Sequence, residues 1–426
     1  MPDMEHRWRH RFPVAAPWRR IAAAVALLLL AWAAGCDATD PPPLSGLEGA
    51  PPDSVTARCL DRAITLSSCL HLYPWAMQLR DANLDLVADL QPALVGRAAV
   101  VWGWEHLALR SLGGMRYRVR DIHDRAPDAV VQGGIFEFVS RDVERLQVPR
   151  RVQLAYGLEP EERHYDLEAM LPAGAEPRWW EGWPVDAVTP DITRLETRLW
   201  YLHLAMVYID EGLEAIHLGA IESVAAHDPD RRWTADLIGR IRAYAADHAR
   251  RGWVILDAHT HGVAQGRRLL LDFHSFPLRP RETGDDGAED VHLAAGFLDA
   301  IYGRSLGGVT PSGRVVRRQR FLVELDNGYA GATPGGCDLP ECVWGSDEIT
   351  WFARQPDARR DHWLAYFHAE VPRLDPAGRF QMPGVRPVQA QLAPGCDHYL
   401  AHDPGAAPCG AGQAEAIANL WGMPQD

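Results

Sequence analysis

The chain has 426 residues and a formal net charge of −14, with 57 acidic residues against 43 basic ones, all of them arginine. Such an acidic balance repels phosphates and excludes a nucleic-acid partner. The absence of lysine excludes a P-loop, a pyridoxal Schiff base and a kinase-type phosphate lysine, and the composition implies no organic cofactor.

The first 35 residues have the pattern of a secretory signal peptide. Five arginines are followed by an uncharged apolar run, Ile21–Ala34, which is too short to span a bilayer stably but suits an h-region. The run ends in Ala-Ala-Gly-Cys36, which resembles the lipobox of bacterial lipoproteins. The resemblance implies cleavage before Cys36 and its lipidation, for example with palmitate. We expect an exported, lipid-anchored chain that faces the periplasm or the cell surface; an uncleaved N-terminal anchor helix is the alternative.

Residues 36–56 are predicted to form a flexible tether rich in proline and glycine. Residues 57–426 contain no second linker and no repeat of fixed period, so we expect a single domain. Because the mature chain is acidic, it is not expected to dock on anionic lipid by charge, and the lipid anchor alone should attach it to the membrane.

Six cysteines follow Cys36 in three closely spaced pairs. They are Cys59 and Cys69, Cys337 and Cys342, and Cys396 and Cys409. No pair has Cys-x2-Cys spacing, so the pattern favours short-loop disulfides in an oxidising compartment over a metal site.

Short apolar runs and helical patterns follow one another along the domain. Strands are predicted at 98–105, 130–138, 215–222, 253–259, 269–274 and 321–326, and helices at 191–210, 234–250, 293–302, 347–354 and 358–371. Strands alternating with helices imply a parallel sheet, hence an α/β fold. Strand ends rich in acids and histidines favour an irregular (β/α)8, TIM-like barrel with loop insertions. The segment 262–267 is too short for a crossover helix, so 253–259 and 269–274 are alternatively a hairpin.

Glu222 and Glu324 each close a predicted strand. Over roughly residues 95–385 the pattern resembles the (β/α)8 glycoside hydrolases, which carry an acid/base glutamate after strand 4 and a nucleophilic glutamate after strand 7. The resemblance implies hydrolysis of glycosidic bonds, with Glu222 as acid/base and Glu324 as nucleophile or second carboxylate. The sequence departs from the family at Ile221, where many members have asparagine. The structural alternative is that both glutamates pair with arginines.

A second group of candidates lies on two of these predicted strands. It comprises Asp257, His259, His261, Asp272 and His274. The strand period of two places those of each strand on one face. They either position the hydroxyls of a sugar, or bind a divalent metal through Asp257, His259, His261 and Asp272 in a metal-dependent hydrolase, or form buried Asp–His pairs.

The remaining candidates suit a carbohydrate ligand. Trp104 and Trp344 are expected as platforms on which sugar rings stack, with Glu137 and Asp326 around the substrate. Asp347 is either a further acid of the cleft or the N-terminal carboxylate of the next helix. A third hypothesis is a non-catalytic surface lipoprotein that binds carbohydrate.

Overall fold

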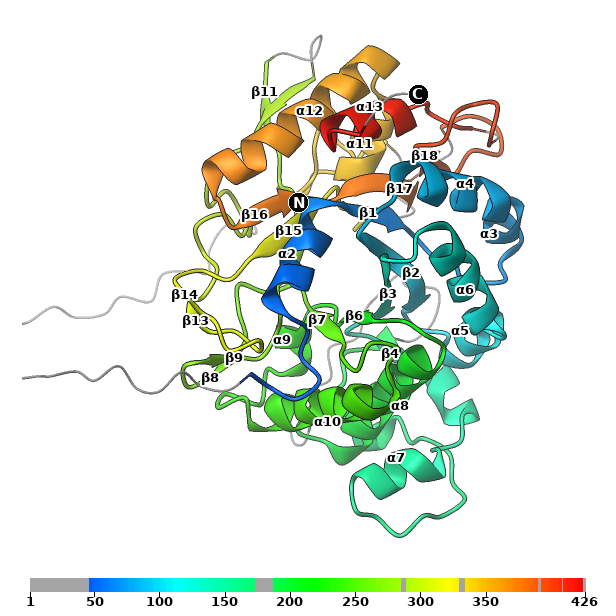
Figure 1. Ribbon diagram of the computed structural model, residues 1–426, viewed down its shortest axis with the longest axis vertical. Coiled ribbons are helices and arrows are strands. Elements are labelled where there is room, and N and C mark those ends of the chain that lie inside the picture. Colours follow the sequence, from blue (N-terminus) through cyan, green and yellow to red (C-terminus); the bar gives the residue numbers. More distant parts are fainter. Residues whose placement is uncertain are drawn as a thin grey trace, which may run out of the picture. The chain divides into compact units, whose positions relative to one another are not determined.

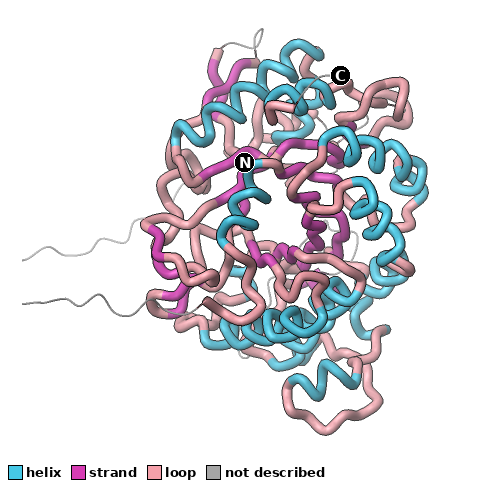
Figure 2. The backbone as a smooth tube through the Cα atoms, in the orientation of Figure 1, coloured by secondary structure: helices cyan, strands magenta, loops and turns pink. Residues whose placement is uncertain are grey.

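The computed structural model describes residues 46–172, 187–284, 289–328, 334–389, 392–407 and 409–423. One compact unit spans Ser45–Asp426. Within it, strands surround a central region and helices lie outside them (Figures 1 and 2). The predicted signal peptide, Cys36 and most of the tether lie outside the described residues.

The larger sheet has seven strands in the order β18-β17-β1-β2-β3-β6-β7. Their bounds are β1 (Ala63–Leu66), β2 (Leu94–Val101), β3 (Val130–Ile135), β6 (Ala215–His217), β7 (Ile255–Asp257), β17 (Met382–Pro387) and β18 (His398–Leu400). All neighbouring pairs are parallel except β17 and β18, which are antiparallel. The strands are almost entirely buried, as expected for a parallel sheet with helices outside it.

A second sheet contains three parallel strands, β10 (His274–Pro277), β15 (Phe321–Glu324) and β16 (Gly378–Phe380). The two sheets meet at both ends. An isolated parallel bridge joins His259 to Ser275 of β10, and one residue, Gln381, separates β16 from β17. The ladders are interrupted at these places and do not form one closed barrel. The structure thus confirms an α/β fold with parallel strands, and not a regular closed barrel.

The helices are α2 (Asp53–Asp61), α3 (Pro74–Gln78), α4 (Arg80–Leu90), α5 (Glu105–Ser111), α6 (Met115–Arg125), α7 (Arg150–Ala155), α8 (Leu195–Asp210), α9 (Ile221–Val224), α10 (Arg232–His248), α11 (Glu348–Arg354), α12 (Asp357–Leu374) and α13 (Ala414–Leu420), with the 3-10 turns η1 (Arg141–Arg145) and η2 (Glu168–Met170). Helix α10 buries Leu237, Ile238 and Ile241, which recur at helical spacing along one face. No helix in the described ranges is long and apolar enough to cross a membrane.

Three further sheets of short strands complete the secondary structure of the described residues. They are β4 (Val139–Ser140) with β5 (Ala187–Val188), β11 (Arg281–Thr283) with β12 (Asp290–His292), and a four-stranded sheet of β14 (Val315–Val316), β13 (Gly308–Val309), β9 (Arg268–Leu269) and β8 (Ala264–Gln265).

Several predicted elements are wrong in detail. The strand expected at 269–274 is divided between β9 and β10, and the alternative hairpin is absent because His259 and Ser275 pair in parallel. The helix expected at 293–302 is a series of turns. The strand expected at 215–222 ends at His217, so Glu222 lies in the short helix α9 and closes no strand.

The structure contains two of the three expected disulfides. Cys337 bonds to Cys342 and Cys396 to Cys409, whereas Cys59 and Cys69 are free. Cys59 lies in α2 before β1, and Cys69 lies after β1. The four-residue strand between them spans about 13 Å, while disulfide-bonded Cα atoms are at most ~7 Å apart. The predicted third pair is therefore wrong.

Candidate functional site

Glu324 is the last residue of β15 and lies at the centre of a buried polar network. Its Oε1 accepts hydrogen bonds from Nε of Arg97 at 3.2 Å and from Nη2 of Arg97 at 2.5 Å. Its Oε2 accepts from Nη1 of Arg386 at 3.0 Å and from the hydroxyl of Thr65 at 3.1 Å. Strands β1, β2 and β17 thus supply four donors, which fill the acceptor positions of one carboxylate.

The two arginines decide the charge of Glu324. Burial alone would raise the pKa of its carboxyl, but the positive charges of Arg97 and Arg386 and the hydrogen bonds of Arg97 lower this pKa below its ordinary value. Glu324 is consequently ionised, and its position is fixed from two sides.

Arg97 reaches this position through an irregularity of β2. Its φ is +57°, and the register between β2 and β3 shifts between Val95 and Ala99. Such a bulge redirects a side chain, and a non-glycine residue with positive φ stores strain that is often found at functional sites. A Cβ on the preceding Gly96 would lie 2.3 Å from Nε2 of Gln381, so the interior admits only glycine there without rearrangement.

Arg97 also connects Glu324 to a pair of histidines. Its Nη2 lies 3.2 Å from Nε2 of His259, which must accept this hydrogen bond and is therefore neutral. Burial, followed by the neighbouring His217 and Arg97, lowers the pKa of His259 to about 3. The His259 and His217 rings meet edge to face with centroids 4.8 Å apart.

His217 is held by a buried carboxylate. Its Nδ1 lies 2.8 Å from Oδ2 of Asp257, which also accepts from the hydroxyl of Ser275 at 2.5 Å, while Gln132 donates to Oδ1 at 2.7 Å. Burial raises the pKa of Asp257 to about 6 and lowers that of His217 well below its usual value. Asp257 thus fixes the orientation of the His217 ring.

Partly exposed side chains form a rim beside this network. Glu137 follows β3, and its Oε2 accepts from the backbone N–H of Ala220 at 2.9 Å. A Cβ on Gly219, whose φ is +49°, would lie 2.4 Å from that oxygen, so glycine permits the approach. The Phe136 ring packs 5.4 Å from the Trp102 ring and carries the Arg97 guanidinium 5.5 Å from its centroid.

The two predicted catalytic glutamates are not in direct contact. Glu222 is exposed, and its Oε1 accepts a hydrogen bond from the hydroxyl of Thr260 at 2.6 Å. Thr260 adjoins His259, which contacts Arg97, and Arg97 in turn holds Glu324. Glu324 is the last residue of the parallel strand β15, and Glu222 lies five residues after the end of the parallel strand β6. Asp326, two residues after Glu324, is partly exposed and lies 3.2 Å from Nη1 of Arg279.

Asp272 and His274 are not brought to this end of the strands. His274 pairs with Phe321 and Pro277 with Glu324, so His274 lies about 10 Å below Glu324 along the strand direction. Asp272 precedes β10 and bonds to Arg242 at 2.9 Å. The alternation of side chains along a strand predicts which face of the sheet a residue joins, but not how far along the strand direction it lies from the residues of other strands.

The described residues contain no group of three or more His, Cys, Asp or Glu placed to hold a metal ion. Asp257 accepts hydrogen bonds at both of its oxygens, and Asp272 accepts at Oδ2 from Arg242 and from the backbone N–H of Leu256. His261 packs against Phe276 at 5.3 Å between ring centroids. The alternative metal ligands thus do not converge in this structure.

The other candidates lie farther out or support local structure. Trp104 is 37% exposed and precedes α5. Trp344 is hydrogen-bonded to the β11–β12 pair. Its backbone N–H donates to the carboxylate of Glu282, and its indole N–H donates to the backbone carbonyl of Asp290. Asp347 caps α11 by accepting from the N–H of Thr350 at 2.8 Å, which is the helix alternative considered for it.

Sequence reasoning missed the cations of the site. Arg97 and Arg386 each lie within a strand, where a charged residue in an apolar run signals either a strand end or a buried pair. The charged Arg97 inside the apolar run Leu94–Val101 could have indicated a buried ion pair. Its partner Glu324 could not be identified from the sequence, because it lies 227 residues away.

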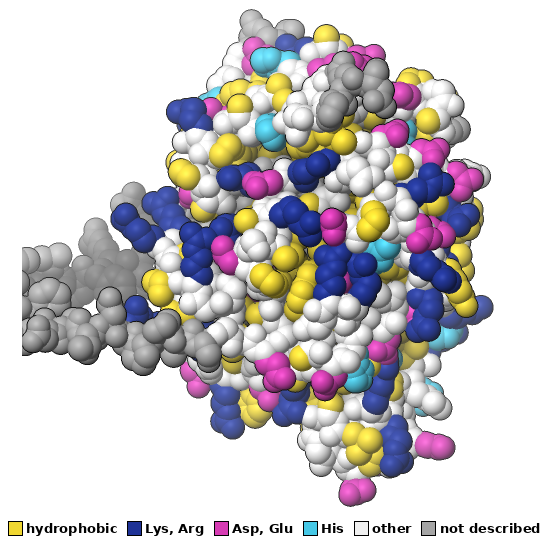
Figure 3. All heavy atoms as spheres, in the orientation of Figure 1, with side chains coloured by type: hydrophobic (Ala, Val, Ile, Leu, Met, Phe, Trp, Pro, Cys, Tyr) yellow, Lys and Arg dark blue, Asp and Glu magenta, His cyan; other side chains and the backbone are white. Residues whose placement is uncertain are grey.

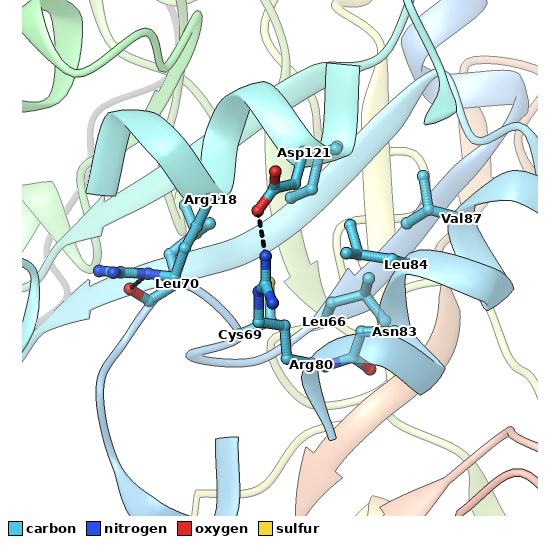
Figure 4. A pocket seen from close by; sticks show the side chains of 10 residues that line it. Leu66, Cys69, Leu70, Arg80, Asn83, Leu84, Val87, Arg118 and Asp121 are labelled. Atoms are coloured by element: carbon cyan, nitrogen blue, oxygen red, sulfur yellow. Dashed lines mark hydrogen bonds and ion pairs between the residues drawn. The ribbon is translucent and has the colours of Figure 1, made fainter. Parts of the chain in front are cut away.

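A small hollow between α4 and α6 is separate from this site (Figure 4). Leu66, Leu84 and Val87 line it, and the ion pair of Arg80 with Asp121, 2.7 Å long, crosses it. Cys69 also lines this hollow, and burial raises the pKa of its thiol to about 12, which keeps the thiol protonated at neutral pH.

No protein-family model matches the chain, and no curated protein matches it. Solved structures with low similarity include AmyP in complex with maltose, with a TM-score of 0.40 and 12% identity over 87% of this chain and 80% of that chain. The glycoside hydrolase domain of PelA from Pseudomonas aeruginosa has a TM-score of 0.32 and 12% identity over 63% and 81%. The noncanonic maltogenic alpha-amylase AmyB from Thermotoga neapolitana has a TM-score of 0.33 and 13% identity over 51% and 50%, so the chain spans about half the length of AmyB.

Proposed function

We propose that the chain is a glycoside hydrolase-like protein built on an irregular (β/α)8-type barrel. Its candidate active site is the end of the strands that carries Glu324. The observation that supports this most is the carboxylate of Glu324, kept ionised by Arg97 and Arg386. Glycosidic cleavage needs such a carboxylate to meet the positive charge that develops on the sugar ring.

In this proposal Glu222 donates the proton and Glu324 is the nucleophile. The glycosidic C–O bond breaks as the leaving oxygen takes the proton of Glu222, and Oε2 of Glu324 bonds to the ring carbon. Attack requires Oε2 to release the Thr65 hydroxyl, the one neutral donor among its partners, while the arginines keep the carboxylate in place. Water then breaks the covalent intermediate and returns a proton to Glu222.

The rim suits a sugar ligand. Phe136 and Trp102 offer aromatic surface next to the carboxylate of Glu137, and sugar rings present apolar C–H faces next to hydroxyl groups. The partly exposed His259 carries a neutral ring that can exchange hydrogen bonds with a hydroxyl group.

Release of reducing sugar from a panel of α- and β-linked oligosaccharides tests the proposal. The full chain should release reducing ends, and Glu222→Gln and Glu324→Gln should each reduce the rate at least about 100-fold, the loss expected when an acid or nucleophile is removed. A parent chain that binds an oligosaccharide without cleaving it would instead favour the non-catalytic hypothesis. That alternative has its own support, because Glu324 is only 6% exposed and all four of its acceptor positions are occupied. A chain that neither binds nor cleaves any member of the panel would refute both.

We also propose that the protein is exported and held to the cell envelope by lipid on Cys36. The arginine-rich start, the apolar run and the lipobox-like Ala-Ala-Gly-Cys36 support this. The disulfides Cys337–Cys342 and Cys396–Cys409 suit an oxidising compartment. Labelled palmitate should enter the chain in bacterial cells, and Cys36→Ser should abolish the label.

A further inference from the structure

The four-stranded sheet β14-β13-β9-β8 has a charge opposite to that of the whole chain. It is built from residues 262–270 and 303–320, which contain no aspartate or glutamate. These segments contain Arg267, Arg268, Arg304, Arg314, Arg317, Arg318 and Arg320. We call this set the arginine face. In a protein with a net charge of −14, so many cations without an acid in the same segments form a distinct surface.

In the part of the chain that the structure describes, two carboxylates form ion pairs with the arginine face. Asp53 pairs with Arg314 at 2.8 Å and with Arg320 at 2.5 Å, and Asp375 pairs with Arg318 at 3.1 Å. These two acids neutralise only part of the charge. Arg267 and Arg317 are exposed, and arginine side chains gather on the side where β13 and β14 lie (Figures 1 and 3).

Exposed apolar side chains accompany the arginines. Val315 in β14 is 66% exposed and Leu306, just before β13, is 44% exposed. Leu306 is linked by backbone hydrogen bonds to His261 and Gln319, so it belongs to the same small sheet region. A cationic surface with protruding apolar groups is typical of proteins that lie on a membrane interface.

The chain also enters the folded unit at this face. The backbone N–H of Leu47 donates to Pro311 O at 2.7 Å, between β13 and β14. Gly46 follows Cys36 by ten residues, which span at most roughly 35 Å when fully extended. A lipid on Cys36 would therefore keep this side of the protein closer to the bilayer than the opposite side.

We propose that the arginine face rests on the anionic headgroups of phospholipids. The inference rests on the proposed lipid anchor, and it changes the expectation, drawn from net charge, that the lipid alone makes the membrane contact. Charge acts over a Debye length of ~8–10 Å, so the nearest arginines govern the contact more than the distant acidic residues. The anchor supplies attachment, and the arginines set the orientation of the site relative to the membrane.

Arginine footprinting with phenylglyoxal on vesicle-bound protein tests this proposal. The full chain with its anchor is bound to vesicles of phosphatidylcholine or of an equimolar mixture with phosphatidylglycerol. Modification of Arg267 and Arg317 should slow about fivefold in the anionic vesicles, the equivalent of ~1 kcal/mol for one arginine at an anionic surface. The exposed Arg110 of α5 and Arg120 of α6 should react equally in both vesicles and serve as internal controls.

Flotation of the same samples separates the contact from the anchor. Protein that floats with both vesicles but shows equal footprints at Arg267 and Arg317 would overturn the inference while the anchor stands. If the protein does not float with phosphatidylcholine, the anchor fails. Flotation with the anionic vesicles is then the deciding measurement. Arg267→Glu/Arg317→Glu should weaken this binding at least roughly 30-fold, the loss of two arginines at ~1 kcal/mol each. The matched pair Arg110→Glu/Arg120→Glu should leave it unchanged, and equal loss in both pairs would count against a specific face.

Discussion

Replacing Arg97 with methionine removes one of the two cations that hold Glu324 while keeping a side chain of similar length. The change deletes both hydrogen bonds from Arg97 to Oε1 and the contact with His259. Removing one partner of a buried ion pair costs ~3–5 kcal/mol because the other charge stays buried. Arg386 and Thr65 still donate to Oε2, so we expect the lower end, about 3 kcal/mol, at pH 7.

The loss should depend on pH in a defined direction. In the parent, the native-state pKa of Glu324 lies below its ordinary value of 4.5. Its contribution to stability is therefore present above pH 4.5 and is lost as the pH falls through the native pKa. In Arg97→Met the native pKa rises, because burial persists and one cation is gone. The deficit should then be largest at pH 7 and shrink towards pH 4, where a protonated Glu324 needs no cation.

Urea unfolding followed by circular dichroism at pH 4 and pH 7 measures this difference. Arg242→Met is a matched control, since it breaks the buried pair with Asp272 away from the site. Both variants should lose stability at pH 7, but only Arg97→Met should lose hydrolysis or sugar binding under conditions where both are folded. An Arg97→Met protein with parental stability at pH 7, or with a deficit independent of pH, would refute the assigned roles of Arg97 and Glu324.

Three further predictions concern the disulfides, a buried acid and metal dependence. Replacing Cys396 and Cys409 by alanine should lower the free energy of unfolding by about 3 kcal/mol. Replacing Cys337 and Cys342 should lower it by only about 2 kcal/mol, because that disulfide closes a shorter loop. Urea titration without reductant measures both losses, and a larger loss for the shorter loop would contradict the loop-entropy model. Burial raises the pKa of Glu105 to about 7, so the unfolded chain gives up this proton at a lower pH than the native one. The contribution of Glu105 to stability should therefore fall as the pH rises from 4.5 to 7. Glu105→Gln should remove this contribution, so the stability of the parent minus that of the variant, followed by thermal shift, should decrease over this range, and a difference independent of pH would contradict the prediction. Hydrolysis should be unaffected by EDTA, whereas activity lost to EDTA and restored by zinc would favour the metal-dependent alternative.

The sequence was sufficient to predict the parts of the fold with the strongest patterns. Long apolar runs identified β2, β3 and β15. The prediction of β15 also placed Glu324 at a strand end. The consecutive strands β16 and β17 escaped prediction because two glycines and two prolines interrupt the run Gly378–Pro387, so alternation is weak there. The four residues of β1 are too few to show a period.

The composition of the site depended on contacts that no local pattern contains. Arg97 lies where the register of β2 shifts, and such an irregularity changes which face a side chain joins. His217 could not be paired with Asp257 from sequence, since the register between β6 and β7 follows from the packing of whole strands. The same limit explains Asp272, which alternation grouped with His274 and which the structure pairs with Arg242.

Covalent trapping tests the central claim about Glu324 most directly. An activated 2-deoxy-2-fluoro glycoside of the sugar identified by the hydrolysis panel should inactivate the enzyme, and peptide mass spectrometry should find the fluorosugar ester on Glu324. An ester on another carboxylate, or steady hydrolysis with no trapped ester, would contradict the role assigned to this residue.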